Sequence, residues 1–328
     1  MPRVTSRDVA RAAGVSQYTV SKVIHNSPHV RPETRAAVET AMKELGYHPN
    51  AVATALRTRT TSVIMFVVRR NMVNSRLTAE LLAGAIQGAN EHEHSVLVVA
   101  VDGDSAAHAL HTYRTGLVSG ALVFAICAND PIVTELASDG CPTISLTQPS
   151  ESTPEQRSIR ADDAGGARAA MRHLLDQGHT HIGILGVGDA LQGLDYDRGH
   201  AAMAEAQRAS AKASFLPCHG WSMENGMRGA AELFRMVPRV TAIFAISDRL
   251  AFGALAAAAK ANLRIPQDLA VVGFDNAEWS AYCTPPLTTV DFPLHSVGRV
   301  GAERLLTNVH TPTHAVPTRL IVRASSGR

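Results

Sequence analysis

Three polar side chains near the N-terminus have the types and the spacing needed to contact the edges of DNA bases. Gln17, Tyr18 and Lys22 fall on the outward side of a short predicted helix that begins after Ser16. A glutamine amide can pair with adenine, a lysine ammonium favours the acceptors of guanine, and a tyrosine ring can contact a thymine methyl group or a phosphate. Lys22 can alternatively contact the DNA backbone alone, because phosphate contacts outnumber base contacts. The pattern indicates a helix that enters the major groove.

Two short helices joined by a turn would position these side chains. Thr5 is placed to cap the first helix, and Asp8 follows at the spacing of a capping box. Gly14 supplies the turn, because glycine adopts a positive φ without strain, and Ser16 is placed to cap the second helix. The alternative interpretation is a small helical hairpin whose polar face is only solvated.

The run from Val4 to Val23 reads Val-Thr-x-x-Asp-Val-Ala-x-x-Ala-Gly-Val-Ser-x-x-Thr-Val-Ser-x-Val. It resembles the N-terminal signature of the lactose-repressor (LacI/GalR) family of bacterial transcription regulators. The resemblance continues through residues 31–35 into a third helix and through the body of the chain to about residue 323. That family usually has Ser or Thr before the proline of the third helix, where this chain has Arg31.

The resemblance implies three parts: an all-α helix-turn-helix headpiece at 1–46, a hinge helix with linker at 47–60, and a two-lobed effector-binding and dimerisation domain at 61–328. Small polar side chains around the predicted helix pair are candidate contacts to DNA phosphates, with capping as the competing role for the first two: Thr5, Ser16, Thr19, Ser21 and Asn26.

The predicted hinge is short and rich in alanine, so it would be a marginal helix alone. In the family the hinge helix orders on operator DNA and inserts a leucine into the minor groove. Leu56 stands at the matching position, and an apolar wedge of this kind unstacks a base step and bends the duplex. The alternative is an ordinary linker with Leu56 packed on the body.

Positive charge is concentrated where DNA contact is predicted. Residues 1–60 contain nine Lys and Arg against four Asp and Glu, which is +5, and the remaining residues contain 22 against 25, which is −3. A basic module on a mildly acidic body is typical of a DNA-binding protein. The four cysteines form no CxxC pair, and neither a signal peptide nor a membrane span is apparent. We expect a cytoplasmic protein with reduced cysteines.

After residue 60, apolar runs alternate with helical stretches, as in doubly wound α/β domains. Strands are expected at 62–68, 96–101, 121–126, 143–146, 181–185, 242–247 and 270–274, and helices at 77–91, 105–115, 131–138, 165–177, 198–209, 224–237 and 249–262. The resemblance implies an α/β periplasmic-binding-protein-like body of two doubly wound lobes. Lobe one would be about 61–160 and 292–320, lobe two about 161–291 and 321–328, with the ligand between them.

Several positions of the body match the family's effector-binding pattern. Arg198 and Asp275 match an arginine and a strand-end aspartate that hold ligand hydroxyls or acids, and Ser247-Asp248 stands where relatives commonly carry Asn-Asp. Asp and Arg together suit a polyol, because they accept and donate two hydrogen bonds each. A mutual ion pair between the lobes is the alternative for Arg198 and Asp275. Trp221 matches an aromatic residue that could stack on a sugar, and a core role is equally consistent.

Two arginines depart from the family pattern. Arg69 ends the first predicted strand of lobe one, and Arg160 precedes Asp162. One hypothesis is that they make the cleft more cationic than a pocket for neutral sugars, so that the effector would carry a carboxylate or phosphate. The alternative is that both lie outside the cleft and face solvent.

Other patterns indicate no catalysis. The run at 91–94, Glu-His-Glu-His, places its histidines on different sides of a helix, and the glycines at 183–188 lack the order of a dinucleotide fingerprint. The sequence shows no hydrolase nucleophile, phosphate-loop or zinc-protease motif. We therefore predict no catalytic residue, metal site or cofactor, and no enzymatic activity.

Together these features predict a transcriptional regulator, in its main interpretation a repressor. A homodimer would bind a pseudo-palindromic double-stranded operator, and a sugar, sugar acid or sugar phosphate bound between the lobes would lower operator affinity. The alternatives are a ligand that acts as a corepressor and a solute-binding receptor without gene regulation.

Overall fold

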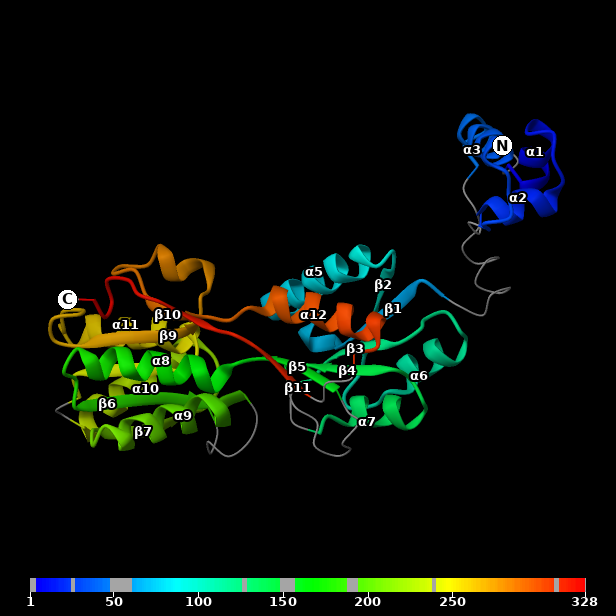
Figure 1. Ribbon diagram of the computed structural model, residues 1–328. Helices are drawn as coiled ribbons and strands as arrows, with labels where there is room; N and C mark the ends of the chain where they lie inside the picture. The colour runs from blue at the N-terminus through cyan, green and yellow to red at the C-terminus, as the bar shows by residue number, and fades with distance from the viewer. Residues whose placement is uncertain are drawn as a thin grey trace. The chain divides into compact units, whose positions relative to one another are not determined.

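The structure is a computed structural model that describes residues 4–24, 27–47, 61–125, 129–147, 157–187, 194–237, 240–309 and 313–327 (Figure 1). The chain divides into two compact units, Met1–Ser62 and Val63–Arg328. Two predicted DNA contacts, Asn26 and Leu56, lie outside the described residues, together with nearly all of the predicted hinge.

Three short helices form the N-terminal unit: α1 (Ser6–Ala12), α2 (Gln17–Ile24) and α3 (Pro32–Glu44). Each contributes one fully buried valine to a small shared core, namely Val9, Val20 and Val38. These residues are apolar at helical spacing, so each helix buries one side. The polar side of α2 is thereby left outside the core.

The predicted helix starts are confirmed by their hydrogen bonds. The backbone N–H and the hydroxyl of Thr5 both donate to Asp8 Oδ2, at 3.0 and 2.7 Å, and these bonds hold the pKa of Asp8 below its ordinary value. Ser16 Oγ accepts from the backbone N–H of Thr19 at 3.1 Å, which caps α2. Gly14 turns the chain between the two helices with φ +65°.

Helix α3 begins without a side-chain cap. Arg31 occupies the N-cap position with extended backbone (φ −60°, ψ 142°), and its side chain makes no capping hydrogen bond. A guanidinium has only donors and cannot accept from the first-turn N–H groups. Pro32 partly compensates, because its ring presets the helical φ and it has no N–H to satisfy.

Replacing Arg31 by threonine is expected to stabilise the start of α3 by about 1 kcal/mol, because the hydroxyl supplies the missing acceptor. Hydrogen exchange of peptides covering residues 32–44 in the full chain measures the effect. Arg31→Ala is the control, since it removes the guanidinium without adding an acceptor. Equal protection in the two variants would contradict the prediction.

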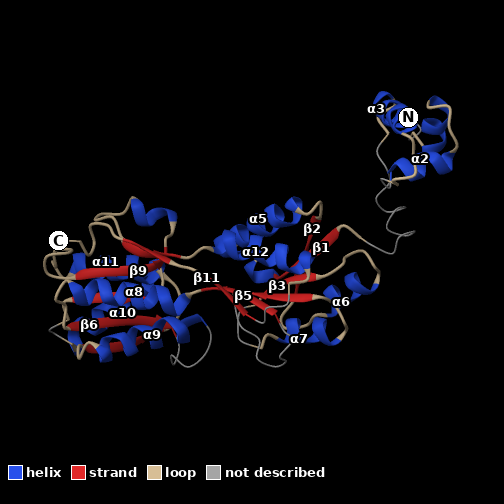
Figure 2. Ribbon diagram, viewed as in Figure 1, coloured by secondary structure: helices blue, strands red, loops and turns tan. Residues whose placement is uncertain are grey.

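The second unit contains two six-stranded sheets, each with helices on both faces (Figures 1 and 2). We call the part built on the first sheet lobe one. Its sheet has the order β11-β5-β4-β3-β1-β2, all parallel. Its elements are β1 (Val63–Arg69), η1 (Arg70–Met72), α5 (Arg76–Glu91), β2 (Ser95–Val101), α6 (Ala107–Arg114), β3 (Ala121–Phe124), α7 (Pro131–Ser138), β4 (Thr143–Leu146), β5 (Arg157–Ala161), α12 (Leu294–Thr307) and β11 (Thr313–Val316).

Alternate residues of β1 show how this sheet is covered. Ile64, Phe66 and Val68 belong to the core on the side of α5 and α12, while Met65 and Val67 pack with α6 and α7 on the opposite face. Because a strand directs successive side chains to opposite faces, a strand that is apolar throughout fits a sheet covered on both sides.

Lobe two is built on the second sheet, of order β12-β10-β9-β8-β6-β7, in which only β12 runs antiparallel to its neighbour. Helices α8 and α9 pack together, as do α10 and α11. Its elements are α8 (Asp163–Asp176), β6 (His181–Val187), α9 (Leu194–Arg208), β7 (Lys212–Cys218), α10 (Met223–Met236), β8 (Ala242–Ala245), α11 (Asp248–Lys260), β9 (Ala270–Asp275), η2 (Glu278–Ala281), β10 (Thr288–Asp291) and β12 (Arg319–Ile321).

The chain passes between the two sheets three times: after β5, after β10, and between β11 and β12. Within lobe two, the parallel strands β6, β8, β9 and β10 end at one edge of the sheet. Ile246, which follows β8, and Asp275, which ends β9, are therefore brought together although they are far apart in sequence.

Glycines allow α5 and α12 of lobe one to approach backbone to backbone. A Cβ on Gly84 would lie 1.9 Å from the carbonyl oxygen of His295, and one on Gly298 would lie 2.0 Å from that of Leu81. Any larger residue at these two positions would force the helices apart. The helix pair is therefore a closely fitted part of lobe one.

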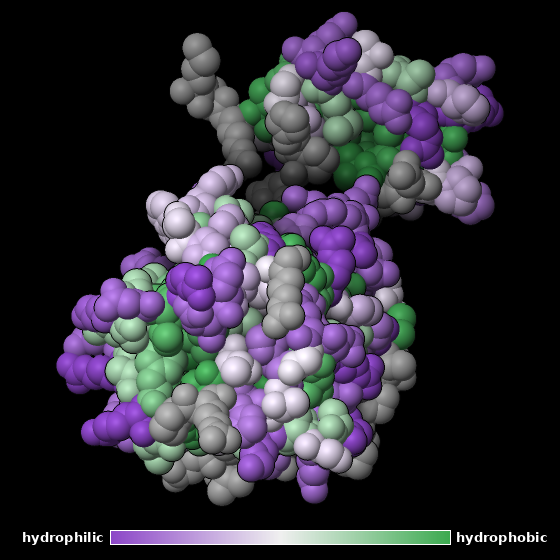
Figure 3. Space-filling model, turned by 90° about the vertical axis from the view of Figure 1, so that its left-hand side faces the viewer, coloured by the Kyte–Doolittle hydropathy of each residue, from purple (hydrophilic) through white to green (hydrophobic). Residues whose placement is uncertain are grey.

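In the part of the chain that the structure describes, no helix is both long and apolar enough to cross a membrane. Figure 3 shows one face of the molecule, on which hydrophilic residues are interspersed with smaller hydrophobic patches.

Candidate DNA-binding and effector sites

The three predicted base-reading side chains are gathered at α2. Tyr18 is 69% exposed, and the ammonium of Lys22 lies 4.7 Å from the centroid of its ring. A cation over an aromatic face is attracted to it, so the two side chains order each other. Gln17 is exposed, and its Nε2 donates to the hydroxyl of Ser6 at 2.8 Å. The arrangement presents an amide, a phenol and an ammonium beside one another.

Several of the candidate phosphate contacts already interact with other residues of the protein. Thr5 and Ser16 both act in helix starts, and Ser16 Oγ also shares a hydrogen bond of 2.9 Å with Thr19 Oγ1. Ser21 already has an interaction partner within the protein. The capping roles weighed for Thr5 and Ser16 are thus present, and a phosphate contact at any of these residues stays a prediction.

Arg198 of α9 is the centre of the polar cluster in lobe two and is only 2% exposed. Its Nε donates to Asp163 Oδ1 at 2.7 Å, and its Nη1 donates to the Ile246 carbonyl at 2.7 Å and to Asp275 Oδ1 at 3.2 Å. A buried guanidinium is tolerated because carboxylates and a carbonyl accept from it. Arg198 and Asp275 thus form an ion pair, but it lies within lobe two and not between the lobes as the alternative from the sequence had it, and it includes a second carboxylate, that of Asp163.

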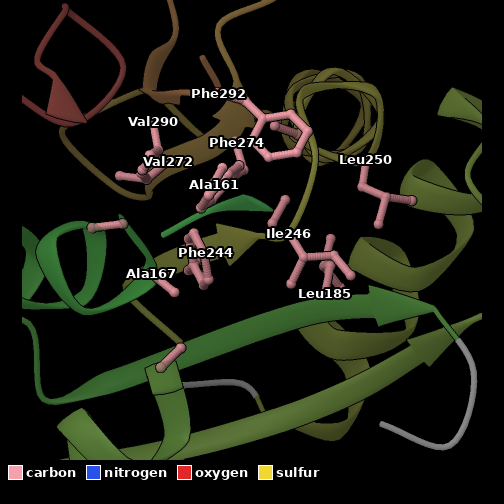
Figure 4. Close-up of a cluster of buried hydrophobic side chains, with 14 of the residues drawn as sticks. Ala161, Ala167, Leu185, Phe244, Ile246, Leu250, Val272, Phe274, Val290 and Phe292 are labelled. Atoms are coloured by element: carbon pink, nitrogen blue, oxygen red, sulfur yellow. The ribbon is translucent and has the colours of Figure 1, made fainter. Parts of the chain in front are cut away.

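Two aromatic rings enclose the same guanidinium. The Arg198 Cζ lies 3.7 Å from the centroid of the Phe274 ring and 4.7 Å from that of Phe292. Figure 4 shows the two rings beside each other in the apolar core, and their planes meet edge to face at 67°. Planar contacts restrict the guanidinium further than the hydrogen bonds alone.

Asp275 combines a strained backbone with a partly accessible carboxylate. Its φ is +114° and that of Asn276 is +46°, a region that non-glycine residues rarely adopt and that clusters at binding sites. Its side chain is 19% exposed, unlike that of Arg198. Burial raises the pKa of Asp275 to about 7, the positive charge of Arg198 opposes this shift, and the carboxylate of Asp248 adds to it.

Asn276 and the residues around it hold this strained turn. The Asn276 amide nitrogen donates to Asp291 Oδ1 at 3.0 Å, and its oxygen accepts from Arg323 Nη2 at 2.9 Å. Its backbone N–H donates to Thr289 Oγ1 at 3.2 Å. The carboxylate of Asp275 is thereby presented by a fixed backbone.

The raised pKa of Asp275 predicts a pH dependence with a definite sign. Between its ordinary value of 3.8 and about 7, the folded protein binds a proton that the unfolded chain does not. The free energy of unfolding contributed by this group therefore falls as pH rises through that window and is flat above it. The difference between the wild type and Asp275→Asn in urea unfolding, measured from pH 4 to 8, isolates this contribution from that of other groups. A difference that rises with pH would contradict the assignment.

Ser247 and Asp248 serve the internal structure of lobe two. Ser247 Oγ accepts from the Leu250 N–H at 3.3 Å and caps α11. The fully buried Asp248 accepts from three donors: the Ala277 N–H at 2.7 Å, Ser280 Oγ at 2.6 Å and Thr289 Oγ1 at 2.5 Å. Burial raises its pKa and these bonds oppose the shift. The bonds of Asp248 to Ala277 and Ser280 brace the loop that follows Asp275.

Arg69 and Arg160 are each held by acidic side chains. Arg69 donates to both oxygens of Asp130, at 2.7 and 3.0 Å, and to Asp104 at 2.8 Å, and it is buried. Arg160 of lobe one donates to Asp197 of lobe two at 2.7 Å. Neither arginine therefore adds an uncompensated positive charge.

Trp221 precedes α10 and is 38% exposed, which leaves part of its ring accessible.

Four residues that contact Arg198 or Asp275 were not identified from the sequence: Asp163, Phe274, Phe292 and Arg76. Asp163 gave no signal beyond its place at a helix start, and Phe274 looked like an ordinary core residue. Arg76 of lobe one donates to the carbonyl oxygen of Asp275 at 3.0 Å and to Glu80 Oε1 at 2.5 Å. These roles depend on contacts between residues far apart in sequence, so only the topology could reveal them.

Both units of the chain match models of known protein families. The family model "Bacterial regulatory proteins, lacI family" matches residues 5–50, and that of the periplasmic binding protein-like domain matches residues 171–326. The HTH-type transcriptional regulator CelR of Thermobifida fusca is 34% identical, over 98% of this chain and 96% of that protein. The chain belongs to the lacI family. The family and the fold class expected from the sequence are confirmed.

Solved structures of the lacI family share the whole architecture. The lac repressor dimer bound to operator and the anti-inducer ONPF superposes with a TM-score of 0.83, at 27% identity and 99% coverage of both chains. The CelR–cellobiose complex superposes with a TM-score of 0.71, at 26% identity, covering 99% of this chain and 100% of that one. Like these lacI-family regulators, the chain is a DNA-binding transcriptional regulator with an effector-responsive body.

Proposed function

We propose that the protein is a dimeric repressor that binds a pseudo-palindromic operator through α2 and is released by a sugar bound between its lobes. Gln17, Tyr18 and Lys22 would choose the operator. The observation that carries the regulatory half is the buried Arg198, which holds the partly exposed carboxylate of Asp275 at the end of a strand. Solved relatives include a repressor dimer on operator and a regulator bound to cellobiose.

The charges of the predicted effector residues favour a neutral polyol over an anionic effector. Arg69, Arg160 and Arg198 each donate to at least one carboxylate. The described cluster therefore offers carboxylate acceptors as readily as cationic donors, which suits hydroxyl groups. This argues against the hypothesis of a cationic cleft, and a sugar acid or phosphate would have to displace one of these internal partners.

The proposed regulator acts by binding and release, so it needs no catalytic step, metal or cofactor. Its proposed site of action is the cytoplasm. Among the described residues, no group of three or more His, Cys, Asp or Glu side chains is arranged to hold a metal ion. The described cysteines, Cys141, Cys218 and Cys283, are free thiols.

The proposal is tested by mobility-shift titration of the full chain on duplexes selected from a random library, with and without cellobiose, glucose, gluconate and glucose 6-phosphate. We expect selected duplexes to bind with a steep salt dependence, and a neutral sugar to weaken that binding. A sugar that strengthens operator binding would show a corepressor instead. No sequence preference at any salt concentration would refute the DNA-binding function.

The proposed minor-groove wedge makes a separate prediction. Leu56→Ala should weaken binding to the selected duplex much more than binding to random DNA, by about tenfold or more, because the alanine methyl group is too small to act as a wedge between two base pairs. Leu45→Ala, at a partly exposed apolar residue of the headpiece, is the matched control. Equal losses on selected and random DNA would rule out the wedge.

A further inference from the structure

Ser6, at the first position of α1, contacts one of the proposed base-reading side chains. Its hydroxyl oxygen accepts a hydrogen bond of 2.8 Å from Nε2 of Gln17, eleven residues later in the chain. Ser6 is half-buried and Gln17 is exposed at the start of α2. The bond ties the tip of a long exposed side chain to the neighbouring helix.

We propose that Ser6 is a positioning residue that orients the Gln17 amide for adenine. The inference rests on the proposed function, since it concerns the same DNA-binding surface. An amide nitrogen carries two protons, and the one donated to Ser6 leaves a second proton beside the carbonyl oxygen. That donor and acceptor match the N7 acceptor and the N6 donor on the edge of adenine.

The same bond discriminates against guanine. Guanine presents two acceptors, O6 and N7, in the major groove. A glutamine could approach them best with its nitrogen turned toward the base, which would remove Nε2 from Ser6. Holding Nε2 on Ser6 thus makes the adenine-pairing orientation the less costly one. Without the bond, the amide is free to rotate and to serve either base.

Lys22 provides an internal reference on the same helix. Its ammonium lies over the Tyr18 ring, 4.7 Å from the centroid, and not in the Ser6–Gln17 hydrogen bond. Preference at the base pair that Lys22 contacts should therefore be independent of the Ser6 hydroxyl. A change confined to one base pair in each half-site separates positioning of Gln17 from a general loss of fold.

The test is selection by the full chain from a library of duplexes with two randomised half-sites, followed by measurement of relative affinities. The wild type should prefer adenine at one position of each half-site. Ser6→Ala should reduce the adenine-over-guanine ratio there by about 2- to 13-fold, the range expected for losing the prior ordering of one long side chain. Other positions and binding to random DNA should be unchanged.

Two further variants make the result decisive. Ser6→Thr keeps the hydroxyl and should keep the preference, whereas Gln17→Ala should abolish it, so that adding Ser6→Ala has no further effect. Thermal melting of each variant checks that the headpiece remains folded. Unchanged preference in Ser6→Ala, a uniform loss on all duplexes, or wild-type preference for guanine would overturn the inference alone. Failure of the wild type to select any duplex would instead overturn the proposed function.

Discussion

Replacing Arg198 by methionine is expected to abolish the response to effector and to lower the free energy of unfolding of the body by about 3–5 kcal/mol. Methionine keeps much of the side-chain volume but removes the charge and all three described hydrogen bonds. The cost arises chiefly because the buried carboxylate of Asp163 would lose its counter-ion. Asp275 would at the same time lose the donor that orients it.

Urea unfolding and effector titration of the full chain measure these two effects. Arg208→Met is the matched control on the same helix, because Arg208 is 61% exposed and its pairing with Glu205 should contribute at most about 1 kcal/mol. We expect the control to keep both its stability and its response to effector. An Arg198→Met protein as stable as the control would show that the buried cluster is not a net requirement of the fold.

The second large effect is expected for Asp248→Ala, at about 3–5 kcal/mol of unfolding free energy. The substitution removes the acceptor of the Ala277 N–H, Ser280 Oγ and Thr289 Oγ1, and each donor left unsatisfied in the interior costs about 1–3 kcal/mol. Because these bonds brace the loop that follows Asp275, effector affinity should fall as a consequence of the lost support.

Unfolding and effector affinity measured together decide which role Asp248 has. Glu224→Ala is the control, since Glu224 is an exposed residue of lobe two that pairs along its own helix with Arg228. If Asp248→Ala unfolds like this control and loses only effector affinity, Asp248 is a direct ligand of the effector, as its place in the family pattern implied.

The headpiece could be predicted in detail because its signals are local. Capping by Thr5 and Ser16 and the turn at Gly14 involve residues within four positions of each other, so the sequence contains the whole interaction. The same holds for the missing cap at Arg31, which was visible as the wrong residue type before a proline.

Several strands and one helix of the body were not expected, for identifiable reasons. The edge strand β7 is partly exposed and contains Pro217, which a strand tolerates only where the N–H faces outward. In β5, two arginines interrupt the apolar pattern. Helix α12 contains Gly298 and Gly301, which lower helix propensity. Packing explains both, because Gly298 faces the backbone of α5 at Leu81 and Gly301 faces the side chain of Leu146 in β4.

For the candidate site, the sequence indicated Arg198, Asp275 and their possible ion pair, but not the other carboxylates that pair with the arginines. Arg198 and Asp275 were found through the family pattern, 77 positions apart. That Arg198 also binds Asp163, and that Arg69 is neutralised by Asp130, depends on which strand ends meet at one edge of a sheet. Because the sequence shows the arginines without their partners, it suggested a cationic cleft. The fold brings carboxylates next to these arginines, and their negative charges balance the positive ones.

The close approach of α5 and α12 has a consequence for how such a regulator diversifies. Gly84 and Gly298 face backbone atoms of the opposing helix at distances that exclude even a methyl group. A mutational screen scored only by loss of repression would rank these glycines with residues at the DNA surface, although they act through the fold of lobe one. New effector preferences must then arise where side chains can vary, at the strand ends, while the helix pair is inherited almost unchanged.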